Sequence, residues 1–215
     1  MQKDHIIMLA WPEGYVRAAG AWYDKFFSIN GKYRVGHSAA VLINSKESKA
    51  YYFDFGRYHT PLGYGRVRDE ETDPNLALPR VNIKSNKIIN LKEILVFLSK
   101  LKSTNGEGRL YASVLSEVSF FDAYNYAKKI QDKGMVQYGP FICRGTNCSR
   151  FTASLAISSL PPFLKKIRLR FPFCISPSPK RNVSILNNTY YVVDKEKVKT
   201  ISKSKLKAYF SSIEI

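Results

Sequence analysis

The chain has 215 residues, 45% of them hydrophobic and 24% charged, with a formal net charge of +17. This length can bury one sizeable core, so we predict a single domain over residues 1–215. No apolar run approaches the roughly 20 residues of a membrane-spanning helix, and the short one near Met1 does not resemble a secretory leader. We therefore expect a cytoplasmic protein, and its three cysteines fit a reducing compartment better than a disulfide framework.

Positive charge is densest between Lys165 and Lys207. Within that segment, the alternation of basic and apolar residues over 165–170 predicts a strand with one basic face. Such charge can attract nucleic acid or an anionic membrane surface, but no nucleic-acid-binding motif accompanies it. We therefore expect a solvated surface that binds no specific nucleic acid and makes at most peripheral contact with anionic surfaces.

The N-terminal third predicts a strand, a helix and a hairpin. Residues 6–10 form a short apolar strand, and residues 15–27 carry apolar side chains at helical spacing. Residues 33–43 and 50–58 are apolar segments on either side of a polar turn, a pattern typical of a β-hairpin.

Two polar residues stand out in this hairpin. His37 follows Gly36 near the start of the first strand, and Asp54 lies within the aromatic second strand. If the hairpin closes near residues 46–47, His37 lies opposite residues 54–58, and an imidazole oriented by a carboxylate is half of a nucleophilic site. Simpler interpretations stay open, namely a core histidine bonded to backbone, and a carboxylate that faces water or pairs with Arg57.

Residues 57–80 are predicted to be irregular and are long for a plain connection, and such loops are often functional. His59 and Tyr64 could line a cleft there or lie on the surface. The acidic residues at 69–73 lack the spacing of a metal-binding loop. The chain has no CxxC or HExxH motif, so we expect neither a metal nor a cofactor.

The remaining chain predicts alternating elements. Strands are expected at 81–89, 109–118, 135–142, 165–171 and 189–193, and helices at 91–102, 120–133 and 203–210. Asn90 and Ser119 are the expected N-caps of the first two helices. Pro172, Pro177 and Pro179 are expected to mark loops.

Cys148 follows the turn at residues 144–147 and precedes an apolar helical pattern that Pro161 and Pro162 end. The first turn of a helix favours a thiolate, because its N–H groups are unpaired and the helix dipole is positive there. The alternative is a small buried residue at a strand–helix corner. Cys143 ends a strand and Cys174 lies in an apolar segment, so neither is expected to be reactive.

Two motifs carry a resemblance to a known group. Gly36-His37-Ser38-Ala39 opens a strand, an acidic residue follows on the next strand, and Asn147-Cys148-Ser149-Arg150-Phe151 begins a helix. This order resembles the circularly permuted papain-like thiol enzymes, which include NlpC-type hydrolases and the lecithin–retinol acyltransferase-like group. As a whole, the chain resembles a bacterial family. The resemblance covers about a quarter of the chain, and the cysteine motif is the more specific of the two.

The resemblance implies that Cys148 is the nucleophile, His37 the base and Asp54 the third polar residue. Asn147 and Ser38 then become candidates to line the cleft. We expect an α+β fold with an antiparallel sheet packed against helices, a permuted papain-like core over about residues 30–160, and a basic C-terminal extension over 161–215. The long His-to-Cys interval and the basic extension depart from the group.

The predicted function is hydrolysis or acyl transfer on an amide, ester or thioester of a small-molecule, peptide or lipid substrate. Two alternatives stay open. One is a papain-like binding module without activity, and the other is a basic protein that binds nucleic acid or an anionic surface.

Overall fold

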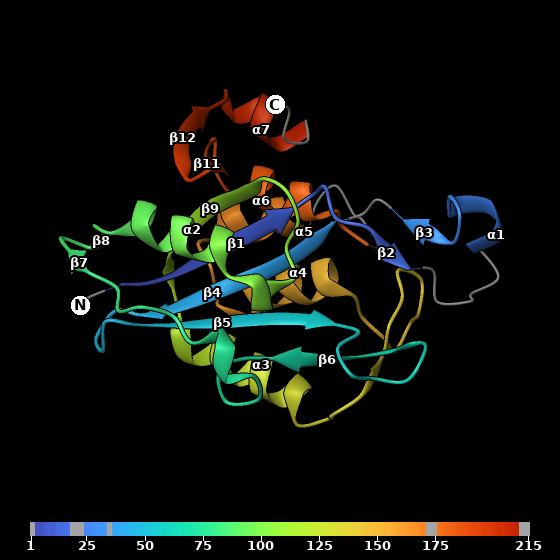
Figure 1. The fold of residues 1–215 in the computed structure, drawn as a ribbon. Coiled ribbons are helices and arrows are strands. Elements are labelled where there is room, and N and C mark those ends of the chain that lie inside the picture. Colours follow the sequence, from blue (N-terminus) through green and yellow to red (C-terminus); the bar gives the residue numbers. More distant parts are fainter. Residues whose placement is uncertain (1–2, 18–23, 34–35, 171–175, 211–215) are drawn as a thin grey trace.

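The computed structural model describes residues 3–17, 24–33, 36–170 and 176–210 (Figure 1). Its main feature is an eight-stranded sheet in the order β10-β6-β5-β4-β1-β9-β11-β12, with antiparallel neighbours along the central strands. The strands are β1 (Asp4–Trp11), β4 (His37–Asn44), β5 (Lys49–Gly56), β6 (Tyr64–Arg68), β9 (Leu110–Val118), β10 (Val136–Gln137), β11 (Thr189–Asp194) and β12 (Lys197–Ser202).

Helices cover both faces of this sheet (Figure 1). One face packs against α3 (Phe120–Gln131), α4 (Cys148–Ser158) and α6 (Pro179–Leu186), and the other against α2 (Leu91–Lys100). In β1, Ile6 belongs to the first core cluster and Ile7 to the second, because successive strand residues point to opposite faces. A central strand buried on both faces explains the unbroken apolar run at the start of the chain.

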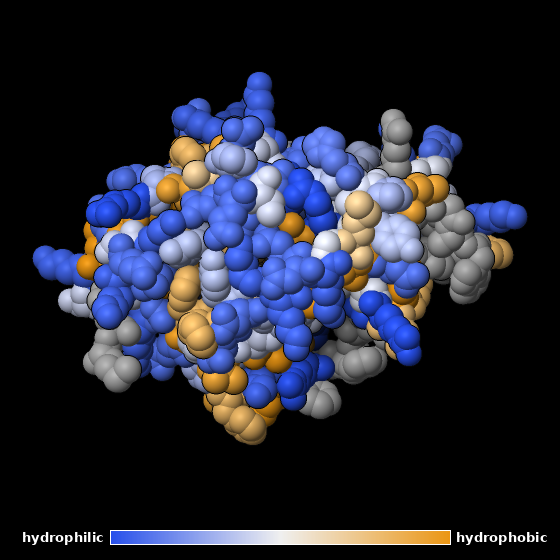
Figure 2. Space-filling model, turned by 90° about the horizontal axis from the view of Figure 1, so that it is seen from below, coloured by the Kyte–Doolittle hydropathy of each residue, from blue (hydrophilic) through white to orange (hydrophobic). Residues whose placement is uncertain are grey.

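Short elements decorate this core. They are β2 (Val16–Arg17), β3 (Lys32–Tyr33), β7 (Ile83–Lys84), β8 (Lys87–Ile88), α1 (Asp24–Phe27), α5 (Phe163–Arg170), α7 (Lys205–Phe210) and the 3₁₀ turns η1 (Pro74–Leu76) and η2 (Lys102–Thr104). Within the described residues, no helix has the length and apolar character needed to cross a bilayer. The face in Figure 2 is mostly hydrophilic, and its hydrophobic residues form small separate groups.

The predicted α+β fold, with an antiparallel sheet packed against helices, is confirmed. The predicted hairpin is β4–β5, and α2, α3 and α4 begin where the sequence indicates. Ser119 caps α3 by accepting a hydrogen bond from the Asp122 N–H. Asn90 does not cap α2 with its side chain, because that oxygen accepts from the Asn82 N–H instead.

The strand predicted at 165–171 is wrong, because the segment forms helix α5 up to residue 170. Pro162 directly precedes this helix, and its carbonyl accepts hydrogen bonds from the N–H groups of Lys165 and Lys166. Proline is tolerated in a first turn, and Lys, Arg and Leu are good helix formers. The alternation of basic and apolar residues therefore did not indicate a strand with one buried face. It lies on a helix of which only Leu169 is buried.

Helix α6 was not predicted, and here too a proline lies at the start of the helix. Pro179 was expected to mark a loop, but it occupies the first turn of α6, which Ser178 caps through the Arg181 N–H. Proline suits this position because its missing N–H would have no partner there. Residues 161–215 thus add α6 to the core and β11 to the sheet beside β9. The division between core and extension at residue 160 stays a prediction.

Three further predictions need correction or fall outside the described residues. The strand expected at 81–89 is the short β7–β8 hairpin, whose turn residues Ser85 and Asn86 both have positive φ. The strand expected at 135–142 is reduced to β10 and an isolated bridge, and Pro140 lacks the N–H that a longer strand needs. The helix expected at 15–27 is described only as β2 and α1, and its middle lies outside the described residues.

Candidate active site

His37 is the first residue of β4, and the residue before it must be glycine. Gly36 has φ +68°, and a Cβ there would lie 2.2 Å from the carbonyl oxygen of Trp11. The Trp11 indole stacks on the His37 ring, with 5.9 Å between the ring centroids. The tight approach of the chain at Gly36 therefore sets the imidazole against an aromatic wall.

The β4–β5 register brings Asp54 to this imidazole. Ala39 pairs with Asp54, and His37, two residues before Ala39 on β4, therefore lies on the same face of the sheet. Nε2 of His37 lies 2.9 Å from Oδ2 of Asp54. A shift of one residue in pairing would turn the carboxylate to the opposite face.

Asp54 is fully buried and is held by several donors. Arg68, its direct cross-strand partner on β6, donates from Nε to Oδ1 at 3.0 Å and from Nη2 to Oδ2 at 2.7 Å. The hydroxyls of Tyr52 and Tyr58 also donate to Oδ2, at 3.0 and 3.3 Å. Burial alone would raise the pKa of Asp54, but the hydrogen bonds and charges of His37 and Arg68 lower it.

Cys148 begins α4 on the other side of the site. Asn147 caps the helix by accepting from the Arg150 N–H at 2.9 Å, and its own amide donates to the Ser176 hydroxyl at 2.7 Å. From α6, the Asn182 amide donates to the Ser149 carbonyl oxygen at 2.8 Å. These bonds fix the first turn of α4, where N–H groups without intrahelical partners point outward.

The Cys148 thiol and the His37 imidazole interact, and each shifts the pKa of the other. Burial alone would raise the pKa of Cys148, but the hydrogen bond and positive charge of His37, with bonds from Ser149 and the Ser38 backbone, lower it. Burial alone would lower the pKa of His37, but Asp54 and Cys148 raise it to about 9. The two directions agree and favour a thiolate–imidazolium pair at neutral pH.

In the thiolate–imidazolium form, four charges alternate in sign through the site, from the thiolate to the imidazolium, the carboxylate and the guanidinium. The side chains of His37, Asp54 and Arg68 are only 13%, 0% and 5% exposed. A thiolate with an adjacent acid–base imidazole can attack an acyl carbon, and the carboxylate fixes the orientation of the ring.

The structure brings together Cys148, His37 and Asp54, as the sequence predicted. Asn147 forms the helix cap and is almost buried. The side chain of Ser38 is also buried and bonds to Thr152 of α4 at 2.9 Å, while its backbone helps to lower the pKa of Cys148.

The remaining candidates lie elsewhere. His59 is exposed in the connection after β5, and no described interaction joins it to Cys148. Tyr64 lines a separate pocket. Cys143 is an exposed turn residue rather than the end of a strand, and Cys174 lies outside the described residues.

The residues that hold Asp54 were not predicted from the sequence. The segment that contains Arg68 was expected to be irregular, but it includes β6, and Arg57 instead lies over the Tyr138 ring. Two signals were present. Tyr52 and Asp54 are two residues apart on one strand and therefore share a face. In addition, a carboxylate buried in an aromatic strand needs a cation as its partner. Within the described residues, no group of three or more His, Cys, Asp or Glu side chains is arranged to hold a metal.

A family model described as "Type VI secretion system effector TseH-like" matches residues 6–162. The chain belongs to the TseH-like family. The crystal structure of the type VI secretion system effector TseH is similar to this fold, with a TM-score of 0.63 and 22% identity over 94% of this chain and 99% of that one. At this identity the likeness shows the fold alone, and most of residues 161–215 take part in it. No curated protein matches the chain.

Proposed function

We propose that this TseH-like chain is a cysteine-dependent hydrolase or acyltransferase, with Cys148 as nucleophile, His37 as acid and base, and Asp54 as the orienting carboxylate. The observation that carries the proposal is the 2.9 Å contact between Nε2 of His37 and Oδ2 of the buried Asp54, beside a Cys148 thiol whose pKa the same imidazole lowers. Family membership supports the more general statement that the chain is a papain-like hydrolase or effector.

Acylation begins when the Cys148 thiolate attacks the carbonyl carbon of an amide, ester or thioester. The carbonyl oxygen becomes an oxyanion, and N–H groups in the first turn of α4 are positioned to stabilise it. The bond to the leaving group then breaks, and the His37 imidazolium transfers its proton to that group. The products are a thioester at Cys148 and a neutral His37.

Deacylation reverses these roles. Neutral His37 removes a proton from water or from a second nucleophile, which attacks the thioester carbon. Collapse of the oxyanion expels the Cys148 thiolate and restores the imidazolium. Asp54 keeps one ring nitrogen bonded throughout, so the other stays directed at the reacting atoms. Hydrolysis and acyl transfer differ only in which nucleophile enters at this stage.

Two further parts of the proposal concern the fold family and the location of the protein. The order of the His37 strand before the Cys148 helix supports a permuted papain-like arrangement, for which the sequence motifs are the main argument. The cytoplasmic location stays a prediction. The family description names effectors of a secretion system, which supports delivery out of the producing cell instead. Fractionation of producing cells and their medium separates these locations.

Labelling with a thiol-reactive acyl probe, followed by mapping of the labelled residue, tests the proposal. We expect the native protein to be labelled at Cys148, and Cys148→Ser to abolish labelling and any acyl-transfer activity. Cys143→Ser is the matched control, because it removes an exposed thiol and should leave labelling unchanged. Labelling of Cys148 only after denaturation would contradict the proposal and would favour a binding module.

A further inference from the structure

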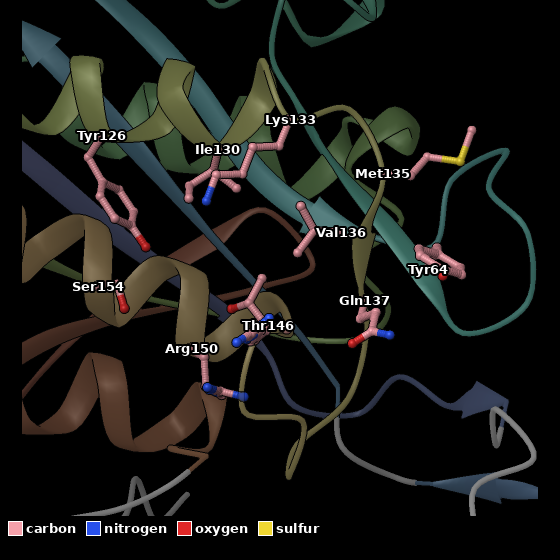
Figure 3. A pocket seen from close by; sticks show the side chains of 12 residues that line it. Tyr64, Tyr126, Ile130, Lys133, Met135, Val136, Gln137, Thr146, Arg150 and Ser154 are labelled. Atoms are coloured by element: carbon pink, nitrogen blue, oxygen red, sulfur yellow. The ribbon is translucent and has the colours of Figure 1, made fainter.

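A pocket of about 490 Å³ lies beside α4, apart from the Cys148 site. Its walls come from the C-terminal half of α3, from β10 and from α4 (Figure 3). Figure 3 shows Tyr126 of α3 reaching toward Ser154 of α4, while Met135 points away from both helices. The volume lies within the range of small-molecule sites.

The charged residues that line the pocket are all cations: Lys133, Arg144 and Arg150. No carboxylate lines it, and within the described part of the chain none of the three forms an ion pair. Other cations of this basic protein do find acidic partners, for example Arg66 with Asp73 and Lys128 with Asp69. Three unpaired cations around one concavity create a local potential that attracts an anion.

Arg150 also has donors to spare. Its Nη1 donates to the carbonyl oxygens of Gly139 and Ile142, and these are its only side-chain bonds to described residues. Nε and Nη2 thus stay available, and a planar guanidinium with two such donors suits a carboxylate or a phosphate. The Tyr126 side chain, which points toward Ser154 in Figure 3, adds a neutral polar group to the same wall.

The pocket wall is hydrogen-bonded and closely packed, and it continues directly into the start of α4. The Thr146 N–H donates to the Gln137 carbonyl oxygen at 2.9 Å, and the Gly139 N–H donates to the Thr146 carbonyl oxygen at 3.1 Å. At Gly145 a Cβ would lie 2.4 Å from the Gln137 oxygen, so the turn packs closely on β10. A ligand would therefore meet a preformed wall only two residues from Cys148.

We propose that this pocket binds an anionic ligand through a carboxylate or phosphate group held by Lys133, Arg144 and Arg150. The proposal does not depend on catalysis at Cys148. The anionic group could belong to the acyl substrate itself or to a separate small molecule, and the two sources predict different effects on the thiol.

The proposal can be tested by titrating the protein with inorganic phosphate or acetate at constant ionic strength. Binding is monitored through the amide NMR signals of Gly145 and Thr146. We expect saturable shifts in the native protein. The double variant Lys133→Gln/Arg144→Gln should bind about fivefold more weakly or worse, because charge-assisted bonds are lost. Gln137→Glu, which adds a carboxylate to the exposed rim, should weaken binding similarly.

Lys84→Gln/Lys87→Gln is the matched control, because it removes two exposed cations from the separate β7–β8 hairpin. It should leave binding unchanged. Equal weakening in both double variants would mean that phosphate follows net charge, which would overturn the proposal, as would shifts that never saturate. Slower iodoacetamide modification of Cys148 with phosphate bound indicates a substrate group, and an unchanged rate indicates a separate ligand.

Discussion

Replacing Arg68 with Met would leave the Asp54 carboxylate buried without its main counter-charge. Arg68 contacts both carboxylate oxygens, at 3.0 and 2.7 Å, and the two side chains are only 5% and 0% exposed. Breaking a buried pair from one side typically costs about 3–5 kcal/mol. Because His37, Tyr52 and Tyr58 still contact Asp54, we expect the lower end of that range, about 3 kcal/mol.

Arg66→Met is the matched control for this substitution. Arg66 lies on the same strand and makes an equally bidentate pair with Asp73, but the two side chains are 23% and 21% exposed. Solvent screens such a pair, so its loss should cost about 1 kcal/mol or less. Urea unfolding followed by circular dichroism at neutral pH measures both variants.

The pH dependence gives a second check. The native pKa of Asp54 lies below its ordinary value of 3.8, so its ionised form adds stability above that pH and loses it as pH falls through the native pKa. The gap between wild type and Arg68→Met should therefore narrow in acid. We also expect iodoacetamide modification of Cys148 to need a higher pH in the variant. Equal losses for Arg66→Met and Arg68→Met, or a gap independent of pH, would refute the reasoning.

Further predictions concern the thiol and its surroundings. At mildly acidic pH, iodoacetamide should modify buried Cys148 before exposed Cys143, and His37→Ala should slow the reaction; modification in order of exposure would argue against a lowered thiol pKa. The pKa of His37 rises from 6.5 to about 9, so its charge adds stability below pH 6.5 that is lost as pH rises through about 9, and the difference in unfolding free energy between wild type and His37→Gln should fall over that range. Gly36→Ala should lower the melting temperature and slow Cys148 modification, because a Cβ has no space at φ +68°, and a variant with unchanged values would show that the turn adapts. Asn147→Ala should cost about 1 kcal/mol through the lost cap, whereas unaltered urea unfolding would mean that the cap contributes little.

The sequence by itself determined the elements whose signals are local. The β4–β5 hairpin follows from apolar and aromatic segments around a polar turn, and the α4 start follows from Asn147 before an apolar helical pattern. The motifs around His37 and Cys148 also suggested that these residues meet. The hairpin and the helix start were inferred from neighbours in the chain, where spacing and residue type carry the information, whereas the meeting of His37 and Cys148 was implied by the resemblance of their motifs to a known group.

Only the tertiary structure decided what surrounds Asp54 and what α5 and α6 become. Arg68 reaches the carboxylate because β6 pairs beside β5, and that pairing depends on packing between distant segments. The alternation at 165–170 fits a strand as well as a helix, and Pro179 fits a loop as well as a first turn. Local patterns leave such choices open, because burial against the rest of the sheet supplies the free energy that selects one of them.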